Sequence, residues 1–416
     1  MSLLESAEAQ ALLDETLVHP QTLRSCQQRL TAFLARYLPL FYRVEQAQNA
    51  VCVIEGLLSN LERKTCEPIA RQHGVQRKPI QFFVGSGKWN DEAVMREMRA
   101  HAVEEFGDAN GVLVFDASSF AKKGAHSCGV QRQWCGRLGK IENCQTGLFL
   151  AYATAESCAP LDRRLFLSET WAADLERRNE THVPEEIVFR KKWEMALDML
   201  DAHGANIPHR WITADDDFGR CAEFRSQLRQ RNELYVLDVP CDTLIRDLEC
   251  GAPQGKRGAP FERVDAWAQS QPASRWEQFK VSDGEKGPIH VRVLRARVKA
   301  RHAQRIGEAE TLLVIRTVEE KPETKFAFSN APAQTALAEL VRVAAQRHRI
   351  EALFEAAKGE AGLAHYEVRS WVGWHHHMTL ALLALLFLLL ERNRLRKKNP
   401  GNDGATDAPD LLALAG

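Results

Sequence analysis

A run of four apolar residues that ends on a carboxylate is the feature that most constrains the fold of this chain. Residues 112–115 (VLVF) are of the β-branched and aromatic types that favour a buried strand, and Asp116 follows them directly. A carboxylate at the carboxyl end of a core strand is anchored by the strand yet open to a ligand, which suits a metal-binding group. An aspartate at such a place is more commonly a turn former or a helix cap, so its role depends on partners elsewhere in the chain.

The composition indicates a globular protein with more than one domain. At 416 residues the chain is too long for one small core, and two or three domains are expected. Lys and Arg together number 55, and Asp and Glu together also number 55. The overall charge therefore neither supports nor excludes a nucleic-acid partner.

The cysteines and the first residues predict a cytoplasmic protein. None of the ten cysteines belongs to a CxxC pair, which argues against a structural zinc site. The opening sequence MSLLESAEAQALLDETL is acidic and amphipathic and does not resemble a secretory signal. We therefore expect free thiols in a reducing compartment.

One apolar stretch, residues 378–390 (MTLALLALLFLLL), imitates a membrane span. It is shorter than the roughly 18–20 residues needed to cross a bilayer, and we expect the flanking GWHHH and ERNRLRKK to prevent its extension. A buried helix in a large core, with no membrane partner, is the prediction. His375, His376 and His377 cannot all face one ion on a helix, where neighbours point about 100° apart, so we expect them to pack or to make polar contacts.

The first hundred residues have the apolar spacing of helices. Asn90 or Asp91 is a candidate N-cap for a helix over KWNDEAVMREMRAHAVEEF. Basic residues between the apolar positions could contact DNA, although a solvated charged face explains them equally well. Residues 85–88 (GSGK) lack the first glycine and the Ser or Thr of a phosphate-binding loop, so we exclude nucleotide binding there.

Strand and helix patterns alternate after Asp116 and predict an α/β core with a mixed sheet. A second short strand, residues 211–213, delivers three acids at its end: Asp215, Asp216 and Asp217. The segment CAEFRSQLRQRN then has a helical pattern, and ELYVLDVP has the pattern of a third strand. Two separate core strands therefore end in carboxylates.

Residues 240–332 differ in character and predict a β-rich insertion. Gly, Pro and charged residues accumulate first, and the strand-like runs IHVRVLRARV and TLLVIRTV follow. Trp267 and Trp276 of this segment could stack on an extruded base, but core packing is the more common fate of a tryptophan.

A long helix is predicted from Ala333 to Lys358. Arg347, Glu351 and Lys358 lie within roughly 40° of one another on its surface, at about 100° per residue. An exposed ion-pair ladder is the common explanation of such a face. The alternative is a third acid flanked by two cations.

Together the three acids allow a specific chemistry. Asp116, Asp215 and Glu351 can converge on one point and hold two divalent cations, for which carboxylate oxygens suit magnesium or manganese. Two such ions activate a water or a 3′-hydroxyl and stabilise the leaving oxygen during in-line attack on a phosphodiester.

These motifs resemble those of the bacterial insertion-sequence transposases of the DDE superfamily, of the cut-and-paste type, whose catalytic core has the ribonuclease H-like fold. The resemblance runs from about residue 111 to residue 390. In that family the third acid lies in a pattern of Tyr, two residues, Arg, three residues, Glu, six residues and Lys. Arg347, Glu351 and Lys358 match this spacing, and Ala344 stands at the tyrosine position. The other matching segments are the KKG turn, GVQRQWCGRLGKIENCQTG, WITADDDFG, SNAP, and EAAKGEAGLAHYEVRSWVGWHHHMTLALLAL.

The resemblance implies roles for five residues. Asp116, Asp215 and Glu351 would be the catalytic acids and would bind two Mg²⁺ or Mn²⁺ ions. Arg347 and Lys358 would contact DNA phosphates. Asp215 is preferred to Asp216 and Asp217 because it directly follows the strand and the TA dipeptide. For Asp238, on the third strand, we expect a buried structural role instead.

The expected fold class is α/β, a ribonuclease H-like catalytic core with a mixed sheet, interrupted by a β-rich insertion and preceded by a helical N-terminal domain. The predicted division is a helical, DNA-binding domain (1–105), the first part of the core (106–239), the insertion (240–332), the part of the core with the third acid (333–398) and a flexible tail (399–416). The implied protein is a homodimer on double-stranded DNA that cleaves and transfers strands at the ends of a mobile element. The alternatives are a DDE nuclease without integration and a catalytically silent DNA-binding regulator.

Overall fold

The computed structural model describes residues 20–250, 259–284, 287–319 and 321–398, and the statements below refer to these residues. The tail expected at 399–416 lies outside them. All ten cysteines are free thiols, as predicted.

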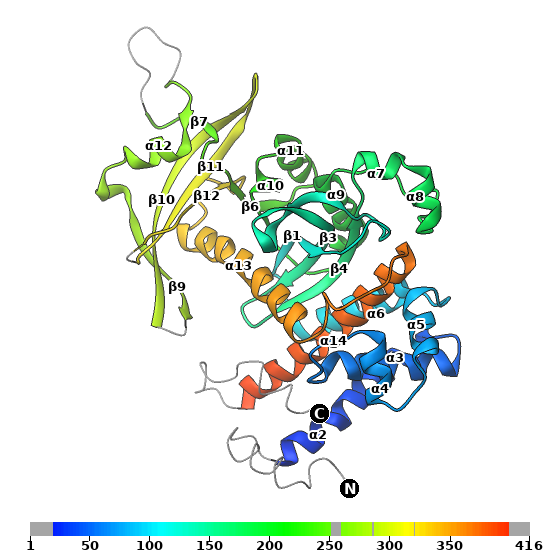
Figure 1. Ribbon diagram of the computed structural model, residues 1–416. Helices are drawn as coiled ribbons and strands as arrows, with labels where there is room; N and C mark the ends of the chain where they lie inside the picture. The colour runs from blue at the N-terminus through cyan, green and yellow to red at the C-terminus, as the bar shows by residue number, and fades with distance from the viewer. Residues whose placement is uncertain (1–19, 251–258, 285–286, 320, 399–416) are drawn as a thin grey trace.

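The N-terminal part is helical, in agreement with its apolar spacing. Its helices pack against the long C-terminal helix α14 (Trp371–Lys398), beside which they lie in Figure 1. Asn90 is the N-cap of the last of them, and its side chain accepts a hydrogen bond of 3.0 Å from the backbone N–H of Ala93. The helices are α2 (Pro20–Ala35), α3 (Val44–Leu58), α4 (Cys66–Gln72), α5 (Arg77–Gly85) and α6 (Asp91–Phe106).

Helix α14 is much longer than the apolar stretch that predicted it, so the expectation that the flanks would stop it was wrong. The flanking histidines are accommodated because each finds a partner: the ring of His376 stacks on Trp89 at 3.8 Å, and His377 Nε2 lies 3.1 Å from the carbonyl oxygen of Gly362. By length and composition alone, residues 371–396 would suffice to cross a membrane, but 83% of their apolar window is buried inside the protein. The helix is the core helix that the sequence predicted.

The central sheet is mixed, and its strand order is consistent with the ribonuclease H-like core that the resemblance implies. In space the order is β4-β3-β1-β5-β6, where β4, β3 and β1 are antiparallel and β1, β5 and β6 are parallel. Helices α10 and α11 connect β5 to β6, whereas the connection from β1 to β5 contains strands as well as helices. The strands are β1 (Val112–Ala121), β3 (Lys140–Ala153), β4 (Cys158–Phe166), β5 (Trp211–Ala214) and β6 (Leu234–Val239). The helices between β4 and β6 are α7 (Glu169–Ala173), α8 (Leu175–Glu180), α9 (Lys192–His203), α10 (Asp216–Gly219) and α11 (Ala222–Gln230).

Strands of the segment 240–332 extend this sheet without a break. Strand β12 pairs antiparallel with β6, and β11, β10 and β7 follow in order, so that a long ribbon projects from the core (Figure 1). Trp267 is buried there and donates a hydrogen bond to Asp247, which confirms its packing role. The elements are β7 (Leu244–Asp247), β8 (Glu262–Arg263), α12 (Val264–Gln269), β9 (Glu277–Gly284), β10 (Gly287–His302), β11 (Arg305–Thr317) and β12 (Thr324–Ser329).

The long helix α13 (Leu337–Gly359) lies against β1, β5 and β6. It begins four residues later than predicted from Ala333, because the chain after Pro332 first forms a turn, closed by a 2.9 Å hydrogen bond from Thr335 N–H to the Pro332 carbonyl. The domain boundaries themselves stay a prediction.

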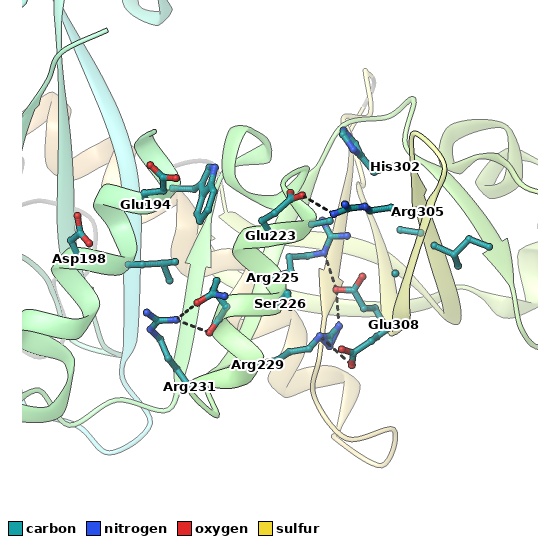
Figure 2. Close-up of a pocket in the computed structure, with 18 of the residues that line it drawn as sticks. Glu194, Asp198, Glu223, Arg225, Ser226, Arg229, Arg231, His302, Arg305 and Glu308 are labelled. Carbon is teal, nitrogen blue, oxygen red and sulfur yellow. Dashed lines mark hydrogen bonds and ion pairs between the residues drawn. The ribbon is translucent and has the colours of Figure 1, made fainter. Parts of the chain in front are cut away.

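A buried carboxylate fastens the β10–β11 ribbon to the core. Glu310 of β11 is 1% exposed and accepts hydrogen bonds from Arg225 Nε at 3.1 Å and from Tyr235 Oη at 2.5 Å. Arg229 Nη2 lies 3.0 Å from the same oxygen. Figure 2 shows Arg225 and Arg229 pointing from α11 toward the ribbon. Both residues line a cavity of about 610 Å³. A fully satisfied buried charge of this kind is costly to break, because its partners lose their compensation.

Replacing Glu310 by Ala therefore leaves the buried guanidinium of Arg225 without its counterion. We expect Glu310→Ala to lower the free energy of unfolding by about 3–5 kcal/mol, as for other broken buried pairs. The matched control is Glu308→Ala. The Glu308 side chain is 74% exposed, and its ion pair with Arg229 is longer, at 3.7 Å. Guanidinium unfolding followed by tryptophan fluorescence checks both, and equal effects of the two variants would contradict this account.

Candidate active site

Two neighbouring parallel strands place the first two predicted acids side by side. Phe115 of β1 is in register with Ala214 of β5, so Asp116 and Asp215 occupy the next position along each strand. The carboxyl ends of parallel strands are the edge at which α/β sheets bind ligands. The apolar run indicated a strand that ends at Asp116, but strand β1 is longer than that run. It continues to Ala121 because β3 pairs with it along its whole length.

The three consecutive acids after β5 have different partners. Asp215 is the N-cap of α10, and its Oδ1 accepts a 3.0 Å hydrogen bond from the N–H of Asp217. Asp216 pairs with Arg220 at 3.2 Å, and Asp217 pairs with Lys192 at 3.2 Å. Both neighbours thus pair with basic side chains, whereas the charge of Asp215 acts on Asp116.

Helix α13 brings a guanidinium into this group of acids. Arg347 Nη1 donates a hydrogen bond of 2.5 Å to Glu351 one turn later. Its Nε lies 3.0 Å from Asp238 Oδ2, as an ion pair without hydrogen-bond alignment. The Arg347 side chain is only 15% exposed. The predicted ion-pair ladder is therefore present between Arg347 and Glu351, but it lies within the site and includes a carboxylate from β6.

The carboxylates of the site differ strongly in proton affinity. Burial, and next the negative charge of Asp215, raise the pKa of Asp116 to about 7. Burial, and next the charge of Asp217, raise the pKa of Asp215 to about 6. A hydrogen bond from His348, together with the charge of Arg347, lowers the pKa of Glu351 to about 2. Two crowded, buried acids beside a well-compensated third are an arrangement typical of functional sites.

All five residues predicted for the site line a single cavity of about 1370 Å³. Asp116, Asp215 and Glu351 lie there with Arg347 and Lys358. The ammonium group of Lys358 lies 5.5 Å from the ring centre of Phe120 and 5.8 Å from that of Phe354. The cavity therefore offers both acids for a cation and bases for a phosphate. The functional roles of the five residues stay a prediction.

The three carboxylates are chemically suited to bind divalent cations, but that of Glu351 does not face the other two. The negative charge of Asp215 raises the pKa of Asp116, an unfavourable interaction that a bound cation would relieve. The carboxylate of Glu351 instead faces Arg347 and His348. Over the described ranges, no three His, Cys, Asp or Glu side chains are grouped closely enough to hold one metal ion. Glu351 would have to release Arg347 in order to join the two aspartates.

Two further residues belong to the site although no functional role was predicted for them. Asp238 was expected to be a structural acid, and it pairs with Arg347. Its place on a strand adjacent to β5, one position beyond the partner of Ala214, was the available signal. Lys192 lines the cavity from α9 and had no sequence motif to mark it.

Phe218 and Gly219 directly follow the three acids at the end of β5, and the glycine has a packing role. A Cβ atom at this position would meet the carbonyl oxygen of Asp238 at 1.8 Å, so only glycine lets α10 pack against β6. This close approach holds the loop of Asp215 next to the strand of Asp238.

Comparisons with known proteins identify relatives of this chain. The family model described as DDE superfamily endonuclease matches residues 36–301, a range that includes Asp116 and Asp215 and ends before Glu351. A protein named "Probable transposase for insertion sequence element IS701", from Microchaete diplosiphon, is 23% identical over 237 residues, which are 55% of this chain and 58% of that protein. The chain thus matches less than two thirds of that relative's length. The NurA nuclease from Sulfolobus solfataricus aligns with a TM-score of 0.25 and 6% identity over 61% of this chain and 81% of that one, so the two folds are not closely similar.

Because the two aspartates repel each other, removing the charge of Asp116 should stabilise the protein, although Asp116 belongs to the candidate site. In EDTA at about pH 8, where both acids are ionised, we expect Asp116→Asn to raise the melting temperature by about 2–4 °C. The gain should shrink as the pH falls below about 7, because Asp116 then carries a proton in the native protein.

Calorimetry checks this expectation, with Asp216→Asn as the control because Asp216 already pairs with Arg220. Magnesium should stabilise the unaltered protein and leave Asp116→Asn unchanged. A lower melting temperature for Asp116→Asn in EDTA would contradict the repulsion.

Proposed function

The chain belongs to the DDE superfamily endonucleases, and on this basis we propose that it is a transposase that cleaves DNA at the ends of a mobile element and joins the freed ends to a target. The observation that carries the proposal is the cavity shared by Asp116, Asp215, Glu351, Arg347 and Lys358. The name of the 23%-identical relative supports an insertion-sequence element as the substrate.

In the proposed reaction the acids and bases of the cavity have separate tasks. Asp116, Asp215 and Glu351 would hold two Mg²⁺ or Mn²⁺ ions, which when bound supply Lewis-acid activation of the attacking and leaving oxygens. Arg347 and Lys358 would fix the phosphates on either side of the scissile bond. Asp238 would keep the guanidinium of Arg347 directed into the cavity once Glu351 has turned to the cations.

The assembly and the setting are part of the same proposal. Two element ends have to be held together for joining, so we propose that the protein acts as a homodimer on double-stranded DNA, in the bacterial cytoplasm and on the nucleoid. The predicted N-terminal domain (1–105) and the predicted insertion (240–332) would contribute to DNA binding, which should weaken with salt.

Cleavage of cognate DNA is the decisive test. The substrate is a duplex that carries the sequences flanking the gene of this protein, incubated with Mg²⁺, Mn²⁺ or EDTA. We expect metal-dependent strand cleavage and joined products, and losses of at least about 10³-fold for Asp116→Asn, Asp215→Asn and Glu351→Gln, as for other catalytic groups. Asp216→Asn and Asp217→Asn are the matched controls, because these side chains pair with Arg220 and Lys192.

The products separate the alternatives. Cleaved DNA without any joined product would identify a DDE nuclease that does not integrate. Binding of the ends without cleavage in either metal would identify a silent regulator and would contradict the proposed catalysis.

A phosphate contact by Lys358 has its own signature in the salt dependence of binding. We expect Lys358→Gln to reduce the slope of log affinity against log salt by about 1, because one counterion fewer is released from the DNA. Lys358→Arg keeps the charge and should keep the slope. Fluorescence anisotropy with a labelled duplex measures both, and an unchanged slope for Lys358→Gln would exclude the contact.

A further inference from the structure

An exposed apolar surface adjoins the same cavity through Trp134, on a hairpin between the first two core strands. Strand β2 (Gln131–Cys135), the turn Gly136–Leu138 and the start of β3 form this hairpin. Trp134 is 63% exposed, and its cross-strand partner Ile141 is 60% exposed. Leu138 of the turn is 44% exposed. We call Trp134, Leu138 and Ile141 the hairpin plate.

Exposure of a large aromatic ring beside an isoleucine costs free energy in water, so such a patch commonly marks a contact surface. The core does not need the hairpin plate for its packing, because its members are among the most exposed large apolar residues of the described chain. A cross-strand aromatic and β-branched pair also stiffens a hairpin.

The hairpin is held in place by hydrogen bonds at its base. The side-chain amide of Asn143 donates to the carbonyl oxygens of Lys122 and Gly124, both at 2.8 Å. The amide of Gln145 donates to the carbonyl oxygen of Cys128 at 2.6 Å. The plate is therefore presented by a fixed support, and a ligand would bind it without ordering a loop first.

The position of Trp134 defines what would bind there. Trp134 and Gln133 line the cavity that holds Asp116, Asp215 and Glu351. The bases Lys192, Arg220 and Lys358 line it as well. Lys192 and Arg220 already pair with Asp217 and Asp216. A ligand with negative charge for Lys358 and a flat apolar face for the plate would fit, and a nucleotide of a DNA strand has both.

We propose that the hairpin plate stacks on an unpaired base of the DNA strand whose phosphate lies at the acids of the cavity. This inference rests on the proposed function, since it takes DNA as the substrate. It adds a subsite, Trp134, that neither binds cations nor contacts phosphate. Stacking is tolerant of sequence because every base has an aromatic face, so the plate would hold a frayed end in place without reading it.

The test measures binding alone, in EDTA, so that it is independent of catalysis. The probes are a labelled oligothymidylate of roughly 12 nucleotides and a chain of the same length made of abasic nucleotides. The unaltered protein should bind oligothymidylate more tightly than the abasic chain. Trp134→Ala should weaken oligothymidylate binding by about five- to hundredfold, the range of base–aromatic stacking, and should bind the abasic chain like the unaltered protein.

Two more variants sharpen the result. Trp134→Phe retains an aromatic ring and should recover most of the preference for bases. Leu175→Ala removes an equally exposed apolar side chain, 72% exposed on α8, and should change nothing. Because Trp134 is on the surface, circular dichroism should report an unchanged fold for every variant.

Three outcomes would overturn the inference: unchanged oligothymidylate binding by Trp134→Ala, an equal loss on both probes, or no preference for bases in the unaltered protein. A change in oligomeric state with unchanged DNA affinity would also overturn it, and would identify the plate as a contact between two copies of the chain. Failure of the proposed function is seen separately, as the absence of cleavage with Mg²⁺ or Mn²⁺ in a protein that still prefers bases.

Discussion

The guanidinium of Arg347 is the interaction on which the site depends. Buried carboxylates repel one another and are poorly solvated, so several of them in one place require a cation. Arg347 supplies that positive charge from α13 and touches acids of its own helix and of β6. Its influence extends to Asp116 and Asp215, whose proton affinities it reduces. The site is thus electrostatically tolerable before any cation binds.

The sheet explains why residues so distant in sequence meet around this charge. Strands β1 and β5 are parallel neighbours, and each delivers an aspartate at the same level. Helix α13 packs against both strands and against β6, which sets the height of Arg347 and Glu351 above them. Gly219 allows the close contact of α10 with β6. The backbone topology therefore determines where the polar side chains of the site lie relative to one another.

The sequence predicted the parts of this architecture that depend on local patterns. Apolar runs indicated β1, β5 and β6, and the spacing of Arg347, Glu351 and Lys358 placed them on one helix face. It could not predict the length of α14, because the partners of its buried histidines come from distant segments. The pairing of Asp238 with Arg347 was likewise hidden, since it depends on strand order. The direction of Glu351 depends on neighbours in space as well.

The unbroken sheet has a mechanical consequence. Because β12 pairs with β6 over residues 326–329, the segment 240–332 is joined to the strand of Asp238 by backbone hydrogen bonds as well as by the chain itself. Rotation of the segment relative to the core would break the backbone hydrogen bonds between β12 and β6, so this connection is stiffer than a flexible linker. Any pull on the projecting β10–β11 ribbon would therefore be transmitted to the strand that supports Arg347.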